Sequence, residues 1–414
     1  RYKPVVMIDI GEMNQSIEMP DLAVLANKFP EMKFVVKKFM WGQMSCVVDV
    51  MYRAENVYAD ISWLHSRDAI RMMCEQFSYK RLLFGLGFKS HGAAAISALL
   101  YAEISQQARD AIAYDNLLSL IDNVSIRERM YESRVRLEPK VKNSYWKPFI
   151  NVQPLPSPVI DAHAHLGPLG NNWYMPSNRL EDHVDILLKD CRQFGLEMTI
   201  NSSVHALNGD SAANNLATER VVGNHKDKIK GYLALNPRYS GDFTEAVIDD
   251  FFSRDYFVGM KFLPAYHKTA THAPEYAAFL QYANKHRLPV LIHTWEGNWG
   301  TAKEVAETAR NYPDAAIIFG HTGGGSQGRR DCEEIAQSPG YDNCVFDFCG
   351  SFCTDIEWPD TLKKIDYQRV VFGSDSYAHE LAWELGRLLS LDIPDEGLKA
   401  ILADNMRRIL SRRI

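Results

Sequence analysis

Eight short apolar segments alternate with longer amphipathic segments between residue 158 and the C-terminus of this chain. Each apolar segment has the length of a strand, and each gap between two of them is long enough for a helix. Strands that alternate with helices pair in parallel, and eight such units in a segment of this size predict a closed (β/α)8 barrel. The predicted strands are Val159–Ala162, Glu197–Ser202, Ile229–Leu235, Phe257–Phe262, Pro289–His293, Ala315–Gly320, Asn343–Phe348 and Arg369–Gly373.

The first predicted strand is followed by two histidines, His163 and His165, in the sequence Asp-Ala-His-Ala-His. Side chains two positions apart on a strand point the same way, so the two imidazoles project into one space. This spacing suits two nitrogen ligands of a divalent metal. A His-x-His pair is weak evidence alone, because a histidine can equally be a buried structural residue.

Further polar side chains fall at the ends of the later strands. Lys261 lies in the fourth predicted strand, His293 ends the fifth, His321 follows the sixth and Asp375 follows the eighth. A (β/α)8 barrel builds its active site at the carboxyl ends of its strands. We therefore expect these side chains to meet the two histidines at one mouth of the barrel.

Taken together, these motifs resemble the amidohydrolase superfamily, in particular the amidohydrolase-2 branch of metal-dependent lactonases and nonoxidative decarboxylases. The order and spacing of six motifs carry the resemblance. They are Ile160–His165, Gly259–Phe262, Leu291–Thr294, Phe319–Gly324, Val371–Asp375 and Asp404–Asn405. The resemblance implies that His163, His165, His293 and Asp375 hold a metal. It implies that His321 is a catalytic residue near that metal or a ligand of a second one.

The chemistry of this residue set agrees with the resemblance. A cation held by three histidines and one aspartate keeps a position open for water and lowers the pKa of that water toward ~7. Asp375 could then accept the water proton and pass it to the leaving group, and His321 could stabilise the developing oxyanion. This predicts hydrolysis of a lactone, ester or amide in a small molecule. We expect one divalent metal, zinc in preference to manganese.

Two other functions stay open on the sequence. In the decarboxylase branch the metal grips substrate oxygens while a histidine or aspartate protonates carbon, so nonoxidative decarboxylation of a carboxylated ring is the alternative reaction. A non-catalytic scaffold is the third reading, and the intact ligand set argues against it. Carbon dioxide release distinguishes the two reactions.

Lys261 and three loop positions bear on the metal count and the substrate. Binuclear relatives carry a carboxylated lysine on the fourth strand, but an uncarboxylated lysine paired with a carboxylate is favoured here, which is consistent with a single metal. Lys261, Arg238, Trp295 and Trp173 are the predicted substrate-binding residues, since aromatic walls with one or two cations suit a small acidic or cyclic substrate. The tryptophans could equally pack the loops.

The first 130 residues parallel the second half of the barrel sequence. The matching segments are separated by 283 to 289 residues throughout, which predicts an internal repeat. They are Pro4–Ile8 with Pro289–His293, Phe29–Glu31 with Tyr312–Asp314, Asn56–Asp60 with Asn343–Asp347, Leu83–Gly87 with Val371–Asp375, and Asp115–Asn116 with Asp404–Asn405.

This repeat lacks the functional residues. Ile8, Lys38 and Gly87 stand where the barrel has His293, His321 and Asp375. The N-terminal segment is therefore predicted to be a degenerate half-barrel, with counterparts of strands 5 to 8 and no catalytic metal. Half a parallel barrel exposes two sheet edges, so we expect an upstream segment, a second chain or a homo-oligomer to complete it.

Proline and charge mark a boundary between the two parts. Prolines are dense from Pro148 to Pro158, and such a run continues neither a helix nor a central strand. The predicted organisation is a half-barrel over 1–130, a connector over 131–157 and a catalytic barrel over 158–414.

The overall composition is that of a globular enzyme, with 46% hydrophobic and 24% charged residues. A net charge of −6 argues against nucleic acid or an anionic membrane as the partner, and no apolar run approaches the length of a membrane span. Seven scattered cysteines without a Cys-x-x-Cys pair indicate a reducing, cytoplasmic location. A small-molecule substrate is the expected partner.

Overall fold

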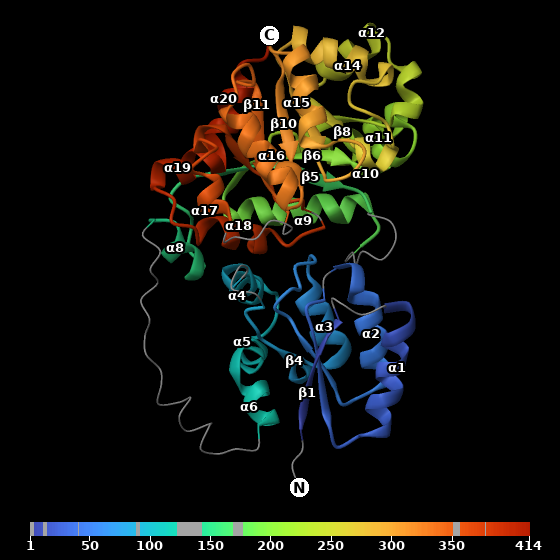
Figure 1. Cartoon of the computed structure of the whole chain (residues 1–414), viewed down its shortest axis with the longest axis vertical. Helices are drawn as coiled ribbons and strands as arrows, with labels where there is room; N and C mark the ends of the chain where they lie inside the picture. Colours follow the sequence, from blue (N-terminus) through green and yellow to red (C-terminus); the bar gives the residue numbers. More distant parts are fainter. Residues whose placement is uncertain are drawn as a thin grey trace. The chain divides into compact units, whose positions relative to one another are not determined.

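The computed structural model describes residues 4–10, 15–39, 41–87, 92–121, 143–168, 177–350, 357–376 and 378–414. They form two compact units (Figure 1). The first unit holds the described residues up to Ile121 together with Leu385–Ser390, and the second holds the remaining described residues from Asn143 onward. No helix among the described residues is long and apolar enough to cross a membrane.

The second unit is built on a parallel sheet of eight strands, which follow one another around the sheet in chain order. A bridge between Ala164 and Ser376 joins the edge strand β5 to the segment after the other edge strand, and the amide of His165 donates to the carbonyl of Ser376 at 2.5 Å. The predicted (β/α)8 barrel is thereby confirmed. The strands are β5 (Val159–Leu166), β6 (Leu196–Ser203), β7 (Ile229–Leu235), β8 (Phe257–Phe262), β9 (Pro289–His293), β10 (Ala316–Gly320), β11 (Cys344–Phe348) and β12 (Val370–Phe372).

One strand prediction was wrong in its boundary. The first strand continues to Leu166 and does not end at Ala162. After a register shift between Asp161 and Ala164, residues Ala164–Leu166 pair with Asn201–Ser203 of β6. His163 and His165 therefore lie inside β5 and not after it. The end of this strand was not predicted because the two polar histidines, which alternate with alanine, interrupt the apolar run.

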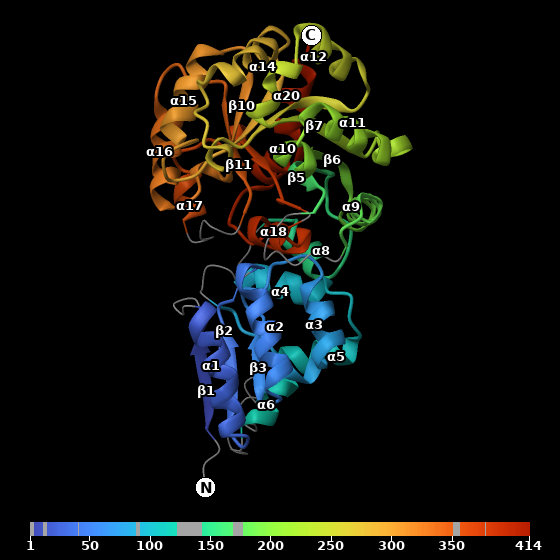
Figure 2. The same ribbon diagram turned by 90° about the vertical axis from the view of Figure 1, so that its right-hand side faces the viewer.

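Helices cover the outside of this sheet (Figure 2). The longer ones bury one face against the barrel, and most of them are amphipathic. They are α9 (Leu180–Phe194), α10 (Val204–Asn208), α11 (Ser211–Val222), α12 (Glu245–Ser253), α13 (Pro264–His267), α14 (Pro274–Lys285), α15 (Ala302–Asn311), α16 (Ser326–Gln337), α17 (Trp358–Thr361), α18 (Leu381–Leu389), α19 (Asp395–Lys399) and α20 (Asn405–Ser411). A π-helical turn, η9 (Ala400–Asp404), precedes α20.

All eight strands contribute to one buried apolar cluster. Its members range from Ile160 on β5 to Val371 on β12, and Met406 and Ile409 of α20 pack against the same cluster. Inside the barrel, the Tyr232 hydroxyl donates to the carbonyl of Ala162 at 2.9 Å. The barrel interior is thus a packed core, which leaves the strand ends to carry chemistry.

Residues Asn143–Pro158 pack with the barrel unit. They contain the short helix α8 (Trp146–Ile150), whose Trp146 and Phe149 are buried. The side chain of Asn143 donates to the carbonyl of Leu391 at 3.1 Å.

The first unit contains a four-stranded parallel sheet in the order β1-β2-β3-β4, as a half-barrel would have. Its strands are β1 (Val5–Asp9), β2 (Lys33–Lys37), β3 (Val57–Asp60) and β4 (Leu82–Leu83). Its helices are α1 (Gln15–Lys28), α2 (Met44–Arg53), α3 (Ala69–Phe77), α4 (Gly92–Tyr101), α5 (Gln106–Asp110) and α6 (Asn116–Leu120), with the π-helical turn η4 (Ala111–Asp115) before α6.

In each unit, an asparagine at a corresponding position joins neighbouring elements through its side chain. Asn56 donates three hydrogen bonds through its side-chain nitrogen, and Asn343 does the same in the barrel. The acceptors are the carbonyls of Ala26, Phe29 and Met32 for Asn56, and of Ala309, Tyr312 and Ala315 for Asn343. Each acceptor in the barrel lies 283 residues after its counterpart.

A second pair of asparagines shows the same correspondence. Asn116, at the start of α6, donates to the carbonyls of Tyr79 and Leu82 at 2.7 and 2.8 Å. Asn405, at the start of α20, donates to the carbonyls of residues 367 and 370 at 2.8 and 2.7 Å. Both asparagines follow a π-helical turn. The four strands of the first unit are therefore built like β9 to β12.

Candidate active site

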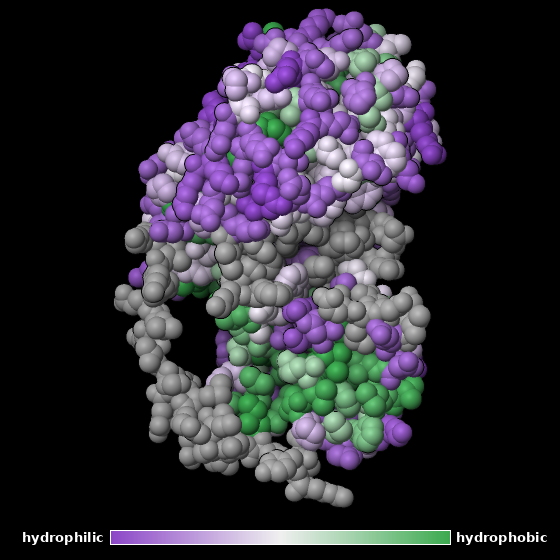
Figure 3. Space-filling model, in the orientation of Figure 1, coloured by the Kyte–Doolittle hydropathy of each residue, from purple (hydrophilic) through white to green (hydrophobic). Residues whose placement is uncertain are grey.

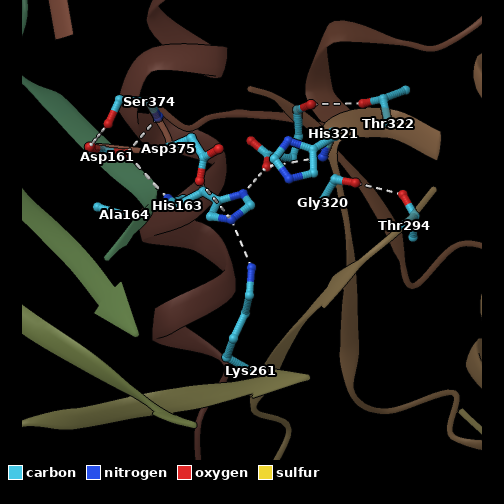
Figure 4. A network of polar contacts seen from close by, with 12 residues as sticks. Asp161, His163, Ala164, Lys261, Thr294, Gly320, His321, Thr322, Ser374 and Asp375 are labelled. Atoms are coloured by element: carbon cyan, nitrogen blue, oxygen red, sulfur yellow. Dashed lines mark hydrogen bonds and ion pairs between the residues drawn. The ribbon is translucent and has the colours of Figure 1, made fainter. Parts of the chain in front are cut away.

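Titratable side chains gather at the carboxyl ends of the barrel strands (Figure 4). His163 and His165 come from β5, Lys261 from β8 and His293 from β9. His321 lies in a 3₁₀ turn directly after β10, and Asp375 follows β12. These residues are all buried.

The backbone is left-handed at two of these positions, with φ of 62° at His321 and 54° at Asp375. Such angles are uncommon for residues with a Cβ and persist only where the surroundings impose them. Near His321 they are imposed by hydroxyl groups: Thr322 Oγ1 donates to the carbonyl of Asp347 at 2.8 Å, and Thr294 Oγ1 donates to the carbonyl of Gly320 at 2.6 Å (Figure 4).

Three residues offer ligand atoms that all lie within 4.8 Å of one another: His163, His165 and Asp375. Asp375 Oδ1 is 3.0 Å from His165 Nε2 and 3.8 Å from His163 Nε2. Two imidazole nitrogens and a carboxylate oxygen that converge in this way can hold a divalent cation.

The opposite nitrogens of both imidazoles already have partners. His163 Nδ1 shares a hydrogen bond with Asp347 Oδ2 at 2.6 Å, and His165 Nδ1 shares one with Ser202 Oγ at 2.9 Å. A metal-binding histidine usually has such a partner behind it, which fixes the ring and its tautomer. Both rings therefore direct Nε2 toward Asp375.

The imidazoles are held in the neutral form that binds metals. Burial lowers the pKa of His165, lowers the pKa values of His163 and His293 well below the ordinary value, and lowers the pKa of His321 to about 4. Neutral imidazole nitrogens offer a lone pair at physiological pH.

Asp375 is the ionised partner in this group. Burial alone opposes its ionisation, but the hydrogen bond with His165 and the nearby His321 hold its pKa well below the usual range. His379 Nε2 lies 3.9 Å from the other oxygen, Oδ2, and His379 Nδ1 is 3.1 Å from Glu384 Oε1. Asp375 is thus a buried carboxylate among imidazoles.

His293 lies beside this group and not within the tight set of ligand atoms found among the described residues. Its ring centroid is 4.9 Å from that of His321 and 5.9 Å from that of Trp295, which stacks on it at 10°. Tyr266 also contacts His293, and its ring centroid is 5.1 Å from that of the imidazole. Trp295 and Tyr266 therefore form aromatic walls beside the histidines.

Lys261 reaches the same group from below (Figure 4). Its Nζ is 2.7 Å from His163 Nε2, and the side chain is fully buried. Burial lowers the pKa of Lys261 to about 8, although the carboxylates of Asp375 and Asp347 oppose this shift. The lysine therefore meets the group of metal-binding atoms directly and does not merely pack in the barrel.

Sequence reasoning missed three members of this site. Asp347, on β11, supports His163 as described above. Asp161 accepts hydrogen bonds from the amides of His163 and Ser374 at 3.2 and 3.0 Å, and so joins β5 to the end of β12. A charged residue inside a buried strand was the available signal for both.

Cys349 is the third missed residue. Its side chain is buried, and its Sγ lies within 4.8 Å of nitrogens of both His163 and His321. Burial raises the pKa of this thiol well above the usual range.

One predicted substrate residue does not join the group. Arg238 is exposed in a short 3₁₀ helix after β7, where its amide donates to Asn236 Oδ1. Trp173 lies outside the described residues.

Comparison with known proteins identifies the family of this barrel. The family model described as "Amidohydrolase" matches residues 160–412. The chain belongs to the amidohydrolase family. The match covers the whole barrel, and the predicted resemblance is thereby confirmed.

Solved structures similar to this amidohydrolase chain match part of its length. Three of them each cover 61 or 62% of this chain and 98 to 100% of their own. The 2,6-dihydroxybenzoate decarboxylase of Rhizobium is 17% identical with a TM-score of 0.49. The "probable 2-pyrone-4,6-dicarboxylic acid hydrolase" of Acinetobacter baumannii is 14% identical with a TM-score of 0.46, and a TIM-barrel protein of Bordetella bronchiseptica is 13% identical with a TM-score of 0.49. A search of curated proteins finds no match.

Proposed function

We propose that residues 158–414 are a metal-dependent hydrolase that cleaves a C–O or C–N bond in a small lactone, ester or amide. The observation that carries this proposal is the buried, ionised carboxylate of Asp375 beside two oriented, neutral imidazoles. His163, His165 and Asp375 would hold one divalent cation, zinc or manganese, with His293 as the fourth ligand. When bound, this cation lowers the pKa of a water molecule and polarises a carbonyl.

The chain's own groups supply the proton transfers. Asp375 would accept a proton from the attacking water and deliver it to the leaving oxygen or nitrogen, because it is ionised at neutral pH and faces the same space as the ligand nitrogens. His321 would stabilise the oxyanion that develops on the substrate. Lys261 and Trp295 border this space, so they would contact the substrate, with Arg238 and Trp173 as further proposed contacts.

An isotope experiment tests the reaction type. The metal-loaded protein is screened against lactones, esters and amides in water enriched in ¹⁸O, and products are analysed by mass spectrometry. Hydrolysis places one ¹⁸O atom in the carboxylic acid product. A parallel set of ring carboxylates reports decarboxylation, since only that reaction releases carbon dioxide.

The outcomes separate the alternatives. Incorporation of ¹⁸O that disappears in Asp375→Asn supports hydrolysis. Carbon dioxide release without a hydrolysis product would identify a nonoxidative decarboxylase instead. No turnover in either set by a protein that binds its metal would favour a scaffold.

A further inference from the structure

The half-barrel of the first unit leaves both ends of its sheet without a neighbouring strand among the described residues. In the barrel, the corresponding strands β9 and β12 have neighbours on these sides: β8 pairs with β9, and a bridge from β5 meets the segment after β12. An open edge of a parallel sheet exposes backbone hydrogen-bonding groups, and parallel sheets are normally covered on both faces. The residues along each open side show how it could be covered.

The first flank consists of Met7 on β1 and Leu25 on α1. These side chains are 52% and 43% exposed. Their counterparts, Ile292 on β9 and Thr308 on α15, are 0% and 1% exposed, because the preceding βα unit covers them. Ile292 is paired with Phe262 of β8, and Thr308 Oγ1 is 2.7 Å from Thr271 Oγ1. The first flank is thus a surface that a closed barrel buries.

The second flank lies at the other end of the sheet, on α6. Leu117 is 38% exposed, whereas its counterpart Met406 on α20 is 1% exposed. Met406 belongs to the buried cluster that contains Ile160 of β5, and Met198 of β6 packs against that cluster. Leu117 lacks this cover. Both flanks are apolar, and Figure 3 shows a broad area of hydrophobic side chains on the exposed face of this unit.

We propose that the half-barrels of two copies of this chain close one eight-stranded barrel between them. The strands β1 to β4 all run in the same direction, so a two-fold axis along the barrel sets β1 of each copy beside β4 of the other in parallel. The first flank of each copy then covers the second flank of the other. Eight strands complete the barrel, and no sheet edge remains.

The shared barrel would serve assembly and not catalysis. Ile8 and Gly87 stand where the catalytic barrel has His293 and Asp375, and Lys38 stands in place of His321. Lys38 and Gly87 keep the left-handed backbone of their counterparts, with φ of 59° and 61°. Lys38 forms an ion pair with Asp9 at 2.6 Å. The backbone of the site is therefore kept, while its metal-binding groups are gone.

A matched pair of substitutions on one helix tests this interface. Leu25→Lys places a charge in the first flank. Val24→Lys is the control, because its counterpart Glu307 is exposed in the closed barrel and Val24 would stay in solvent. Leu117→Lys tests the second flank. The mass of the whole chain and of each variant is measured by sedimentation equilibrium over a range of concentrations.

We expect particles of two chains for the wild type and for Val24→Lys. Leu25→Lys and Leu117→Lys should weaken association by about 100-fold or more, since each buries an unpaired charge. Unchanged circular dichroism and metal content would show that these variants fold. A wild type that stays a single chain at every concentration would overturn the proposal, as would a dimer that survives both substitutions.

Hydrogen exchange on the wild type gives an independent result. The amides of Val5–Asp9 that face the open edge should become protected as the concentration rises into the range of the dimer. Exchange in β1 that does not respond to dimer formation would place the interface elsewhere and overturn the proposal.

Discussion

Behind each imidazole that faces Asp375 lies a second polar group. Asp347 supports His163, and Ser202 supports His165, so each ring reaches the site with its orientation already fixed. The half-barrel keeps one such supporting residue without a site to support. Its Asp60 aligns with Asp347, but its partner is Ser62, and the four strands described in this unit include no counterpart of β5, the strand that carries His163.

This difference gives a matched test of Asp347. Asp347→Asn should weaken metal binding by about 10- to 100-fold, because the amide no longer holds His163 as a carboxylate does. Asp60→Asn should leave the affinity unchanged. Both affinities are measured by competition with a chromophoric chelator. Equal affinities in Asp347→Asn and the wild type would contradict the supporting role.

Of the substitutions considered, replacement of Asp375 should have the largest effect on turnover. Asp375→Asn should lower turnover by about 10²–10⁴-fold, because an amide accepts no proton from water. Circular dichroism should show an intact barrel. Turnover is measured at saturating metal, so that a change in affinity is separated from a change in chemistry. Unchanged turnover would exclude Asp375 as the base.

The lowered pKa of His321 predicts a pH dependence of stability. Between pH 6.5 and about 4 the unfolded chain binds a proton at this residue while the folded chain does not. The free energy of unfolding therefore falls as the pH falls. Between pH 7 and pH 5 this residue should account for about 2 kcal/mol of the loss in the metal-free protein.

Urea unfolding of the metal-free barrel measures this contribution. His321→Gln removes the titrating group, so the variant should lose less stability than the wild type between the two pH values. The other buried histidines titrate in both proteins, so the difference between the two losses reports His321 together with its effect on the neighbouring His163 and His293. Parallel losses would show that His321 does not contribute.

At the scale of the elements, most strands could be predicted because a buried parallel strand is a continuous apolar run. Phe257–Phe262 and Pro289–His293 match β8 and β9 residue for residue. The end of β5 could not be predicted in this way, because its pairing with β6 beyond Asp161 depends on a register shift and on neighbours distant in sequence.

Part of the candidate site could also be predicted from the sequence, and part could not. Residues at strand ends converge in any barrel, so His163, His165 and Asp375 could be expected to meet. Asp347 and Cys349 could not be assigned, because their roles depend on which side chain faces them across the barrel. Arg238 also follows a strand, but its loop carries the side chain outward into solvent.

The close approach of β12 and β5 predicts an effect of a small substitution. A Cβ on Gly373 would lie 2.5 Å from Asp347 Oδ1 and 2.5 Å from His163 Cβ. Gly373→Ala should therefore displace His163 and reduce the metal content and the melting temperature. Gly241→Ala is the control, since its Cβ meets no atom within 4 Å. A full complement of metal in Gly373→Ala would show that the strands can separate without cost to the site.

At the scale of the whole molecule, the chain contains two parallel sheets of related construction that differ in the residues at their strand ends. The barrel has the candidate ligands, and the half-barrel keeps the asparagine contacts and the left-handed turns without them. Contacts that join strands to helices depend on backbone carbonyls, so they survive changes of side chain at the strand ends. The catalytic groups have no such structural role in the half-barrel, which is consistent with their replacement there.

The central claim is that the barrel holds one divalent metal through His163, His165 and Asp375. Elemental analysis of the purified chain by inductively coupled plasma mass spectrometry tests it most directly, with His163→Ala as the comparison. The account predicts about one zinc or manganese per chain in the wild type and a loss of that metal in the variant. Metal that persists in His163→Ala, or a wild type that takes up none after reconstitution, would contradict it.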